Sequence, residues 1–347
     1  MHTINVIRHM GGEAMTRTLS IRMVAALAGA ATLFAVTLPF GAAHAELKTW
    51  RHGIVEAKSD AGFIMMAAEN GFAEKEGLKV EIVQFKGDAL ALKAMLAGEL
   101  DSYEGSPGGP LVAASRGADL KVIGCHWPKV TYGIFSKPDI ASPKDLKGKS
   151  FAISNPGALP DLLARAVLEQ NGITADQVKF AIMGSDADRY RALSAGVVDV
   201  ATASTEFAAL NAKTGMKLLV HANDVVPKYI RFCFYASSKT RQNRPAELTS
   251  LLTAEMKALK YALANRDAVI SLSNKITGAK PDDTRAAYIY DEVKKLSAVD
   301  PTMAIPVDHL QWMQELFMKT GNLTKAVDLS QFVDESFRKK ALEAVGK

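Results

Sequence analysis

Glycines and small polar residues stand immediately before several predicted helices of this chain. The turn Ser154-Asn155-Pro156-Gly157-Ala158 follows an apolar segment and leads into an amphipathic run over residues 159–170. A helix N-terminus carries unpaired N–H groups and the positive end of the helix dipole, so such a turn favours an anionic or strongly polar ligand atom. Glycine also lets that atom approach the backbone closely. The pattern therefore predicts a ligand-binding site built from turns.

Similar turns recur along the chain, and together they form the predicted ligand-binding set. Its members are small or charged residues near the ends of predicted strands: Lys58, Ser59, Asp60, Gly87, Asp88, Glu104, Gly105, Ser106, Ser154, Asn155, Gly157, Ala158, Ser185, Asp186, Thr202, Ser204 and Arg231. Some of them also have a structural explanation. Asp88 and Asp186 suit helix N-caps, and Arg231 lies in an apolar segment, where a charge needs an ion-pair partner.

An internal repeat indicates how these turns are arranged. Residues 87–121 align without a gap on residues 185–219, which places Asp88 on Asp186 and Asp101 on Asp199. Each copy reads as strand, helix, glycine stop, short strand and second helix. Alternating strands and helices predict a mainly parallel sheet, so two copies predict two α/β lobes.

Two extended apolar segments predict where the chain passes between the lobes. We expect it to cross near Tyr132–Ser136 and to return near Phe232–Ala236, which makes a double-strand hinge. The predicted division is residues 46–134 for the first part of lobe 1, 135–232 for lobe 2, and 233–347 for helices that complete lobe 1. Ligands of open α/β sheets bind beyond the carboxyl ends of the strands, so the turns of both lobes should face one cleft.

Residues 1–45 have the features of a signal peptide. Arg17 and Arg22 supply a basic start, the apolar run Met23–Leu38 follows, and Ala43-His44-Ala45 fits a cleavage site. The run is shorter than the about 20 residues that a membrane-spanning helix needs. We therefore expect cleavage after Ala45 and a periplasmic protein, whose translation starts at Met1 or at Met15.

The composition excludes several functions. The net charge is +5, and no basic stretch with interleaved aromatic residues occurs, so nucleic-acid binding has no support. Cys125 and Cys233 have no metal-ligand spacing, and either a disulfide or two free thiols fits them. No GxSxG, HExxH or phosphate-loop motif is present, although a Ser-His-Asp set drawn from distant residues stays open. We expect no metal, no cofactor and no catalysis.

Three stretches carry a resemblance to a known family. They are GDALALKAMLAGELDSYEGSPGGPLVAASRGADLKVIG, IASPKDLKGKSFAISNPGALPDLLARAVLEQNGI and LQWMQELFMKTGNLTKAVDLSQFVD. They resemble the periplasmic solute-binding proteins of nitrate, sulfonate and taurine ABC importers, a family that includes binders of thiamine pyrimidine precursors. The resemblance implies a type II, two-lobed periplasmic binding protein that closes on a small solute at its hinge. It also implies delivery to a membrane permease with its ATPase, by a monomer.

The resemblance leaves the solute open. In sulfonate and nitrate binders the anion is held by helix-end N–H groups and hydroxyls, at positions that correspond here to Ser59, Ser106, Ser154 and Gly157. Several acids expected at the same cleft, such as Glu104 and Glu206, would repel a compact sulfonate unless basic residues match them. A larger organic solute with an anionic end and donor groups is therefore our hypothesis. A pyrimidine precursor, a sensor in place of the permease, and an exported enzyme of the same fold are the alternatives.

Overall fold

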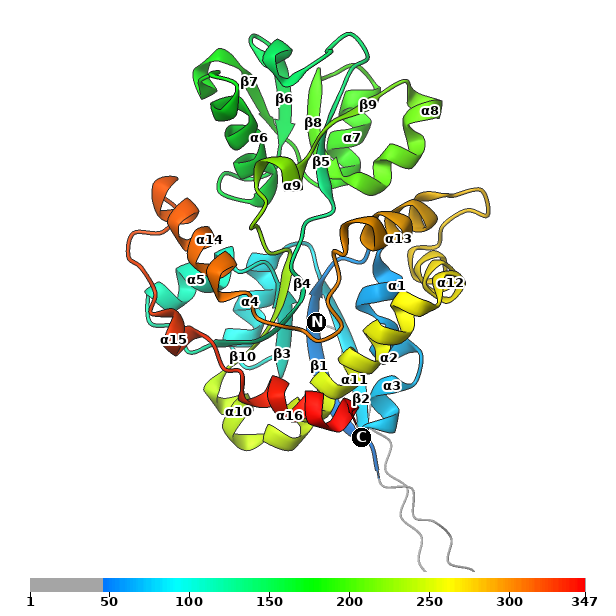
Figure 1. The fold of residues 1–347 in the computed structure, drawn as a ribbon, viewed down its shortest axis with the longest axis vertical. Helices are drawn as coiled ribbons and strands as arrows, with labels where there is room; N and C mark the ends of the chain where they lie inside the picture. Colours follow the sequence, from blue (N-terminus) through cyan, green and yellow to red (C-terminus); the bar gives the residue numbers. More distant parts are fainter. Residues whose placement is uncertain (1–45, 347) are drawn as a thin grey trace, which may run out of the picture. The chain divides into compact units, whose positions relative to one another are not determined.

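The computed structural model describes residues 46–346 (Figure 1). The predicted signal peptide and its cleavage site lie outside these residues. The described part contains two five-stranded sheets, and no helix in it is long and apolar enough to cross a membrane.

The first sheet is mixed, with one strand that arrives from a distant part of the chain. Its order is β2-β1-β3-β10-β4, and the strands are β1 (Lys48–Val55), β2 (Leu78–Phe85), β3 (Ser102–Gly105), β4 (Lys121–Trp127) and β10 (Phe232–Ala236). Strand β1 pairs in parallel with β2 and β3, whereas β10 runs antiparallel to β3 and β4.

The second sheet repeats this arrangement. Its order is β7-β6-β8-β5-β9, and the strands are β5 (Tyr132–Ser136), β6 (Ser150–Ile153), β7 (Lys179–Ile182), β8 (Val200–Ser204) and β9 (Lys217–His221). The aligned repeat places helix α4 (Asp88–Leu96) on helix α7 (Asp186–Ser194), and β3 on the start of β8. The predicted repeat and the α/β fold are confirmed, and each sheet with its helices is called a lobe below.

The predicted hinge strands are sheet strands. Strand β5 pairs on both sides within the second sheet, with β8 and β9, and β10 pairs on both sides within the first. Pairing on both sides satisfies their backbone groups. The predicted crossing is therefore corrected to the short segments 128–131 and 226–231. The predicted boundary between residues 134 and 135 falls inside β5, and the division into lobes stays a prediction.

Helices cover both sheets. The first lobe contains α1 (Ala61–Ile64), α2 (Met66–Glu69), α3 (Phe72–Lys75), α4, α5 (Gly108–Ser115), α10 (Ser238–Asn243), α11 (Pro245–Ala264), α12 (Arg266–Thr277), α13 (Arg285–Leu296), α14 (Val307–Lys319), α15 (Leu329–Phe332) and α16 (Ser336–Val345). The second contains α6 (Leu159–Gln170), α7, α8 (Asn211–Thr214), α9 (Ala222–Val225) and the short 3-10 helices η1 (Pro143–Leu146), η2 (Ala175–Gln177) and η3 (Thr205–Leu210). Helices α6 and α7 both pack against β6 and β8 (Figure 1).

The apolar cores explain why the C-terminal helices return to the first sheet. Trp50 and Trp127 of that sheet are fully buried in one cluster with Phe63 of α1 and Leu251 and Leu252 of α11. Helix α11 also packs on α16, beside it in Figure 1. Burial of large side chains stabilises each by about 1.5–3 kcal/mol. The predicted return of the C-terminal helices to lobe 1 is consistent with this core.

A disulfide joins two neighbouring antiparallel strands of the first lobe, β10 and the edge strand β4. Cys125 of β4 and Cys233 of β10 are bonded to each other, across a sequence separation of 108 residues. The strands are neighbours in the sheet, so the two side chains meet although they are distant in sequence. Of the two possibilities that the sequence left open, the structure therefore has the disulfide.

Candidate functional site

The predicted turns lie at corresponding edges of the two sheets. In the first lobe, residues 56–60 follow β1, Ser106 follows β3, and Arg231 precedes β10. In the second lobe, Ser154 follows β6, residues 183–186 follow β7, and residues 205–206 follow β8. Because β5 runs antiparallel to β8, its first residue, Tyr132, reaches the same edge.

Asp186 is the centre of a charged group that joins the two lobes. Its carboxylate forms ion pairs with Lys58 of the first lobe and with Arg189 one turn along α7. The hydroxyl of Tyr132 donates to it at 2.6 Å, and Lys58 Nζ lies 3.3 Å from that hydroxyl. Arg189 Nε donates to the Thr202 carbonyl at 2.7 Å, which holds the guanidinium in place. These residues, with Asp60, Glu206 and Arg231, are called the inter-lobe cluster.

The ionisation of this cluster follows from its charges. Burial alone would raise the pKa of Asp186, but Lys58 and Arg189 hold it below its usual value. Burial would likewise lower the pKa of Lys58, and Asp186 raises it instead. Burial, with Asp186 beside it, raises the pKa of Tyr132 to about 12. At neutral pH two cations thus share one carboxylate and a neutral phenol.

Arg231 forms an ion pair, as the sequence predicts for a charge in an apolar segment. Its guanidinium is paired with Asp60, and Nη1 donates to Thr131 Oγ1 at 2.9 Å. It also stacks over the rings of Trp127 and Phe232, at 4.3 and 4.5 Å from their centroids. Two members of the predicted ligand-binding set therefore bind each other and tie the loop after β1 to the returning segment.

Glu206 of the cluster and two carboxyl groups outside it, Glu104 and Asp88, have raised pKa values. Burial raises the pKa of Glu104 well above its usual value, and Glu255 nearby adds to this. Burial, with Asp60 close by, raises the pKa of Glu206 to about 7, and burial raises that of Asp88 to about 6. His126 Nε2 lies 3.3 Å from Glu104 Oε2, and burial lowers the pKa of His126 to about 3, so this imidazole is neutral.

The N-termini of α6 and α7 are occupied by the protein's own carboxylates. The Gly157 N–H donates to Asp161 at 2.8 Å, and Ser185 forms a reciprocal cap with Asp188 on α7. The N-caps of α4 and α7 are Gly87 and Ser185, so the N-cap hypothesis for Asp88 and Asp186 is wrong. Asp186 instead turns toward Lys58 of the other lobe, because that contact pairs its charge.

The remaining predicted residues separate into two groups. Thr202 and Ser204 are fully buried within the second sheet, where their hydroxyls donate to the carbonyls of Ala152 and Thr131. Ser59 and Gly105 are buried at the edge of the first sheet, and Ser106 Oγ lies 3.0 Å from Tyr229 Oη. Asn155 and Ser185 are exposed, and Gly87 and Ala158 are half-buried. The predicted set is thus only partly gathered in one place.

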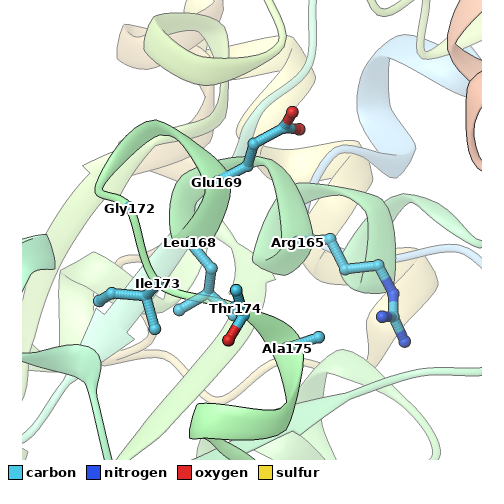
Figure 2. A pocket seen from close by; sticks show the side chains of 7 residues that line it. All are labelled: Arg165, Leu168, Glu169, Gly172, Ile173, Thr174 and Ala175. Carbon is cyan, nitrogen blue, oxygen red and sulfur yellow. The ribbon is translucent and has the colours of Figure 1, made fainter.

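Two surface hollows adjoin helix α6. One of about 400 Å³ lies at its C-terminal end, and Figure 2 shows the residues that line it: Arg165, Leu168, Glu169, Gly172, Ile173, Thr174 and Ala175. The other, of about 280 Å³, is bounded by Pro156, Gly157 and Asp161 and by Thr320 and Asn322, which follow α14. Of the predicted ligand-binding residues, Gly157 is the one that borders either of these hollows.

Sequence reasoning missed parts of this site. Tyr132 was assigned to a hinge strand, and Thr131, which accepts a hydrogen bond from Arg231, was given no role. Arg189 was considered only as one of the basic residues that could match the acids of the cleft, and the available signal for its pairing with Asp186 was their spacing of three residues on a predicted helix. Among residues 46–346, no group of three or more His, Cys, Asp or Glu side chains is placed to hold a metal ion.

Comparisons with known proteins agree on one family. A family model described as NMT1/THI5 like matches residues 58–269. A protein of Bacillus subtilis (strain 168) named "Putative aliphatic sulfonates-binding protein" is 26% identical over 309 residues, which are 86% of this chain and 90% of that protein.

Solved structures show the same fold. The periplasmic aliphatic sulphonate binding protein SsuA from Escherichia coli matches with a TM-score of 0.70 at 20% identity, over 83% of this chain and 92% of that one. The desulfurization enzyme DSZB matches with a TM-score of 0.66 at 18% identity, over 86% of this chain and 99% of that one. The predicted two-lobed fold of periplasmic binding proteins is confirmed, and a binding protein and an enzyme share it.

Proposed function

Because this chain belongs to the NMT1/THI5-like family, we propose that it is the periplasmic solute-binding component of an ABC importer. Its solute is a small organic anion, bound between the two lobes. The name of the Bacillus relative and the fold shared with SsuA support this assignment. The partners are a membrane permease and its ATPase, and the protein acts as a monomer.

The inter-lobe cluster is the observation that carries the proposal. Lys58 belongs to the first lobe, whereas Asp186 and Tyr132 belong to the second, and they are in direct contact. A solute shifts a hinge equilibrium only by as much as it binds one conformation better than the other. Contacts to both lobes at this point would supply that difference and would favour the closed conformation.

The charges at Asp186 explain the preference for an anion. Lys58 and Arg189 both pair with this one carboxylate, which leaves one positive charge in excess there. Arg189 is almost fully buried, whereas the Lys58 side chain is 28% exposed. An anionic group of the solute would be bound at Lys58, where the ammonium can still be reached.

Binding without catalysis is part of the proposal. The fold alone does not separate the two functions, because the desulfurization enzyme DSZB has it as well. Both cysteines of the sequence are joined in a disulfide, so this chain offers no thiol nucleophile. A binding protein needs none.

The test is a thermal-shift screen followed by calorimetry, with aliphatic sulfonates, aliphatic carboxylates and aromatic acids as probes. A solute at one hundred times its Kd adds about 2.7 kcal/mol to the free energy of unfolding, which such a screen detects. Lys58→Met should weaken the affinity for the best probe at least tenfold. The matched control is Lys48→Met, since Lys48 is an exposed lysine paired with Glu247. Equal affinity in wild type and Lys58→Met would contradict the proposed site.

A further inference from the structure

A histidine of the second lobe lies against a glutamate of the first, outside the inter-lobe cluster. His221 ends β9, and its Nδ1 is 3.4 Å from Oε1 of Glu292 on α13. Helix α13 also packs against η3 of the second lobe, so this contact lies where the lobes meet. The His221 side chain is 35% exposed, whereas that of Glu292 is 5% exposed. Solvent can therefore deliver a proton to the imidazole, and the carboxylate is shielded.

The carboxylate of Glu292 lacks a permanent cation beside it. Among residues 46–346, it forms no ion pair with a lysine or an arginine, and Oε1 has no hydrogen-bond partner. The 3.4 Å separation from His221 is longer than an ordinary N–H···O bond of about 2.7–3.2 Å. A buried carboxylate oxygen without a partner is costly. A proton on His221 would turn this contact into a shorter and stronger charge-assisted hydrogen bond.

The charges around His221 favour that proton. The contact with Glu292 is the main cause that raises the pKa of His221 above its ordinary value of 6.5, and partial burial of the ring opposes it. Asp224 of α9 acts in the same sense as Glu292, and Lys295 of α13 acts against them. Two carboxylates thus outweigh one ammonium at this imidazole.

The other elements packed on His221 add no competing ion pair. In β5, its partner is Gly133, which has no side chain. The one titratable side chain of η3 is Glu206, whose Oε1 lies 3.9 Å from Arg285. Tyr288 of α13 acts on Glu292, but burial, with that carboxylate nearby, raises its pKa to about 12, so the phenol is neutral. The charge of this contact therefore changes when His221 titrates.

We propose that His221 and Glu292 form a proton-dependent contact between the lobes, which favours the closed conformation when His221 is protonated. Regulation by pH rests on the proposed function, because closure is the step that holds the solute. When the lobes separate, His221 loses Glu292, and its pKa returns toward the ordinary value. The closed form consequently binds the proton more tightly. The stabilisation of the closed form is complete below pH 6.5 and is lost as the pH rises through the raised pKa.

An NMR titration of the histidine ring protons, without any solute, tests the contact itself. His221→Asn identifies the resonance. In wild type the pKa of His221 should lie above 6.5, and in Glu292→Gln it should fall, since an amide of similar shape carries no charge. The control is Asp291→Asn, because Asp291 is the neighbouring acid of the same helix and pairs with Arg266. This control should leave the pKa of His221 unchanged.

Small-angle scattering without solute tests the coupling to closure, between about pH 8.5 and pH 5.5, where histidine changes charge. The radius of gyration of wild type should decrease in acid, and His221→Asn should show less than half of that decrease. His309→Asn should show all of it, because His309 lies beside Asp308 within α14. Glu206 also gains a proton in this range, but wild type and both variants contain it.

Circular dichroism checks that each variant is folded. A His221 pKa at or below 6.5 in wild type, or one that Glu292→Gln leaves unchanged, would overturn the contact. No decrease in the radius of wild type, or equal decreases in wild type and His221→Asn, would overturn its coupling to closure. The proposed function stands in each of these cases, because neither experiment contains a solute. Conversely, a screen in which no acid binds would leave both of these results as they are.

Discussion

At the scale of single residues, this site is organised by the partner that each charge finds. Asp186 is almost fully buried, and it is stable there because two cations and a phenol surround it. Breaking a buried pair by removing one partner typically costs about 3–5 kcal/mol, since the other charge is left uncompensated. Glu206 has no comparable partner, and its raised pKa reflects this.

The pH dependence of stability should report the burial of Glu206. Its pKa rises from the ordinary 4.5 to about 7, mainly because burial disfavours the charged form. The unfolded chain therefore loses this proton first, and the stability that the group contributes is complete below pH 4.5 and is lost as the pH rises through 7. Glu206→Gln cannot ionise. Relative to this variant, wild type should lose roughly 3 kcal/mol between pH 4.5 and about pH 8.

Urea unfolding of both proteins across this range measures the difference. Glu255→Gln is an internal reference, because burial raises the pKa of Glu255 to about 8. The stability that Glu255 contributes should therefore be lost up to a higher pH than that of Glu206. A difference between wild type and Glu206→Gln that stays constant with pH would show that Glu206 is not perturbed.

At the scale of elements, the turn before α6 was predicted to bind a ligand, but in the structure its groups bind other parts of the protein. Its glycine N–H is bonded to Asp161 of the same helix, and the turn lies against Asn322 of the other lobe. The backbone at Gly157 has φ +79°, a conformation that glycine adopts without strain. The turn is therefore both a capped helix start and an inter-lobe contact.

Alanine substitutions separate the cost of the left-handed conformation at Gly157 from the effect of its contact with Asn322. Gly172 follows the C-cap of α6 and has φ +68° with open space around it, whereas a Cβ at Gly157 would meet the Asn322 amide. Both Gly157→Ala and Gly172→Ala should lose about 1–2 kcal/mol of unfolding free energy from the left-handed conformation. Gly157→Ala should lose more, and Asn322→Ala should remove the excess in a double-mutant cycle. Equal losses at both glycines would mean that the contact with Asn322 is not made in solution.

The β4–β10 pair of the first lobe depends on the Cys125–Cys233 disulfide. Closing a loop of 108 residues stabilises a fold by about 4–5 kcal/mol in the chain-entropy model. Reductant should therefore lower the midpoint of chemical unfolding of wild type, and the Cys125→Ser/Cys233→Ser variant should show the lower midpoint without reductant. The double variant should not respond to reductant. An unchanged midpoint for reduced wild type would rule out a stabilising disulfide.

At the scale of the whole molecule, the lobes are joined by two short segments and by several ion pairs. Lys319 pairs with Glu169 at 2.7 Å, and Lys213 with Asp282 at 3.5 Å, and all four side chains are exposed. Exposed pairs contribute only about 0–1 kcal/mol each. These exposed pairs therefore oppose separation of the lobes only weakly, and the buried pair of Lys58 with Asp186 is the contact that opposes it most.

Small-angle scattering should detect that selection. With a saturating solute from the screen, the radius of gyration should decrease, because contacts to both lobes stabilise the closed conformation. Lys58→Met should show a smaller decrease at the same solute concentration, since it removes a contact of the first lobe with the second. A radius that does not change on binding would argue against hinge closure.

The sequence by itself determined the repeated order of strands and helices. Asp88 and Asp186 begin equivalent helices, as the ungapped alignment predicts, because the period of apolar residues and the glycine stops depend only on neighbours along the chain. The same local patterns placed polar residues after β1, β3, β6, β7 and β8. They were therefore enough to predict two α/β lobes and the edge of each sheet at which we propose the site.

Only the tertiary structure decided which side chains bind one another. Lys58 meets Asp186 across 128 positions, and Arg231 meets Asp60 across 171. It also placed β10 beside β4 in the first sheet, which brought Cys125 beside Cys233. Charge pairing and disulfide formation depend on distance through space, and that distance is set by how the whole chain packs. A local pattern carries no information about it, and for that reason the partners of these residues could not be derived from the sequence.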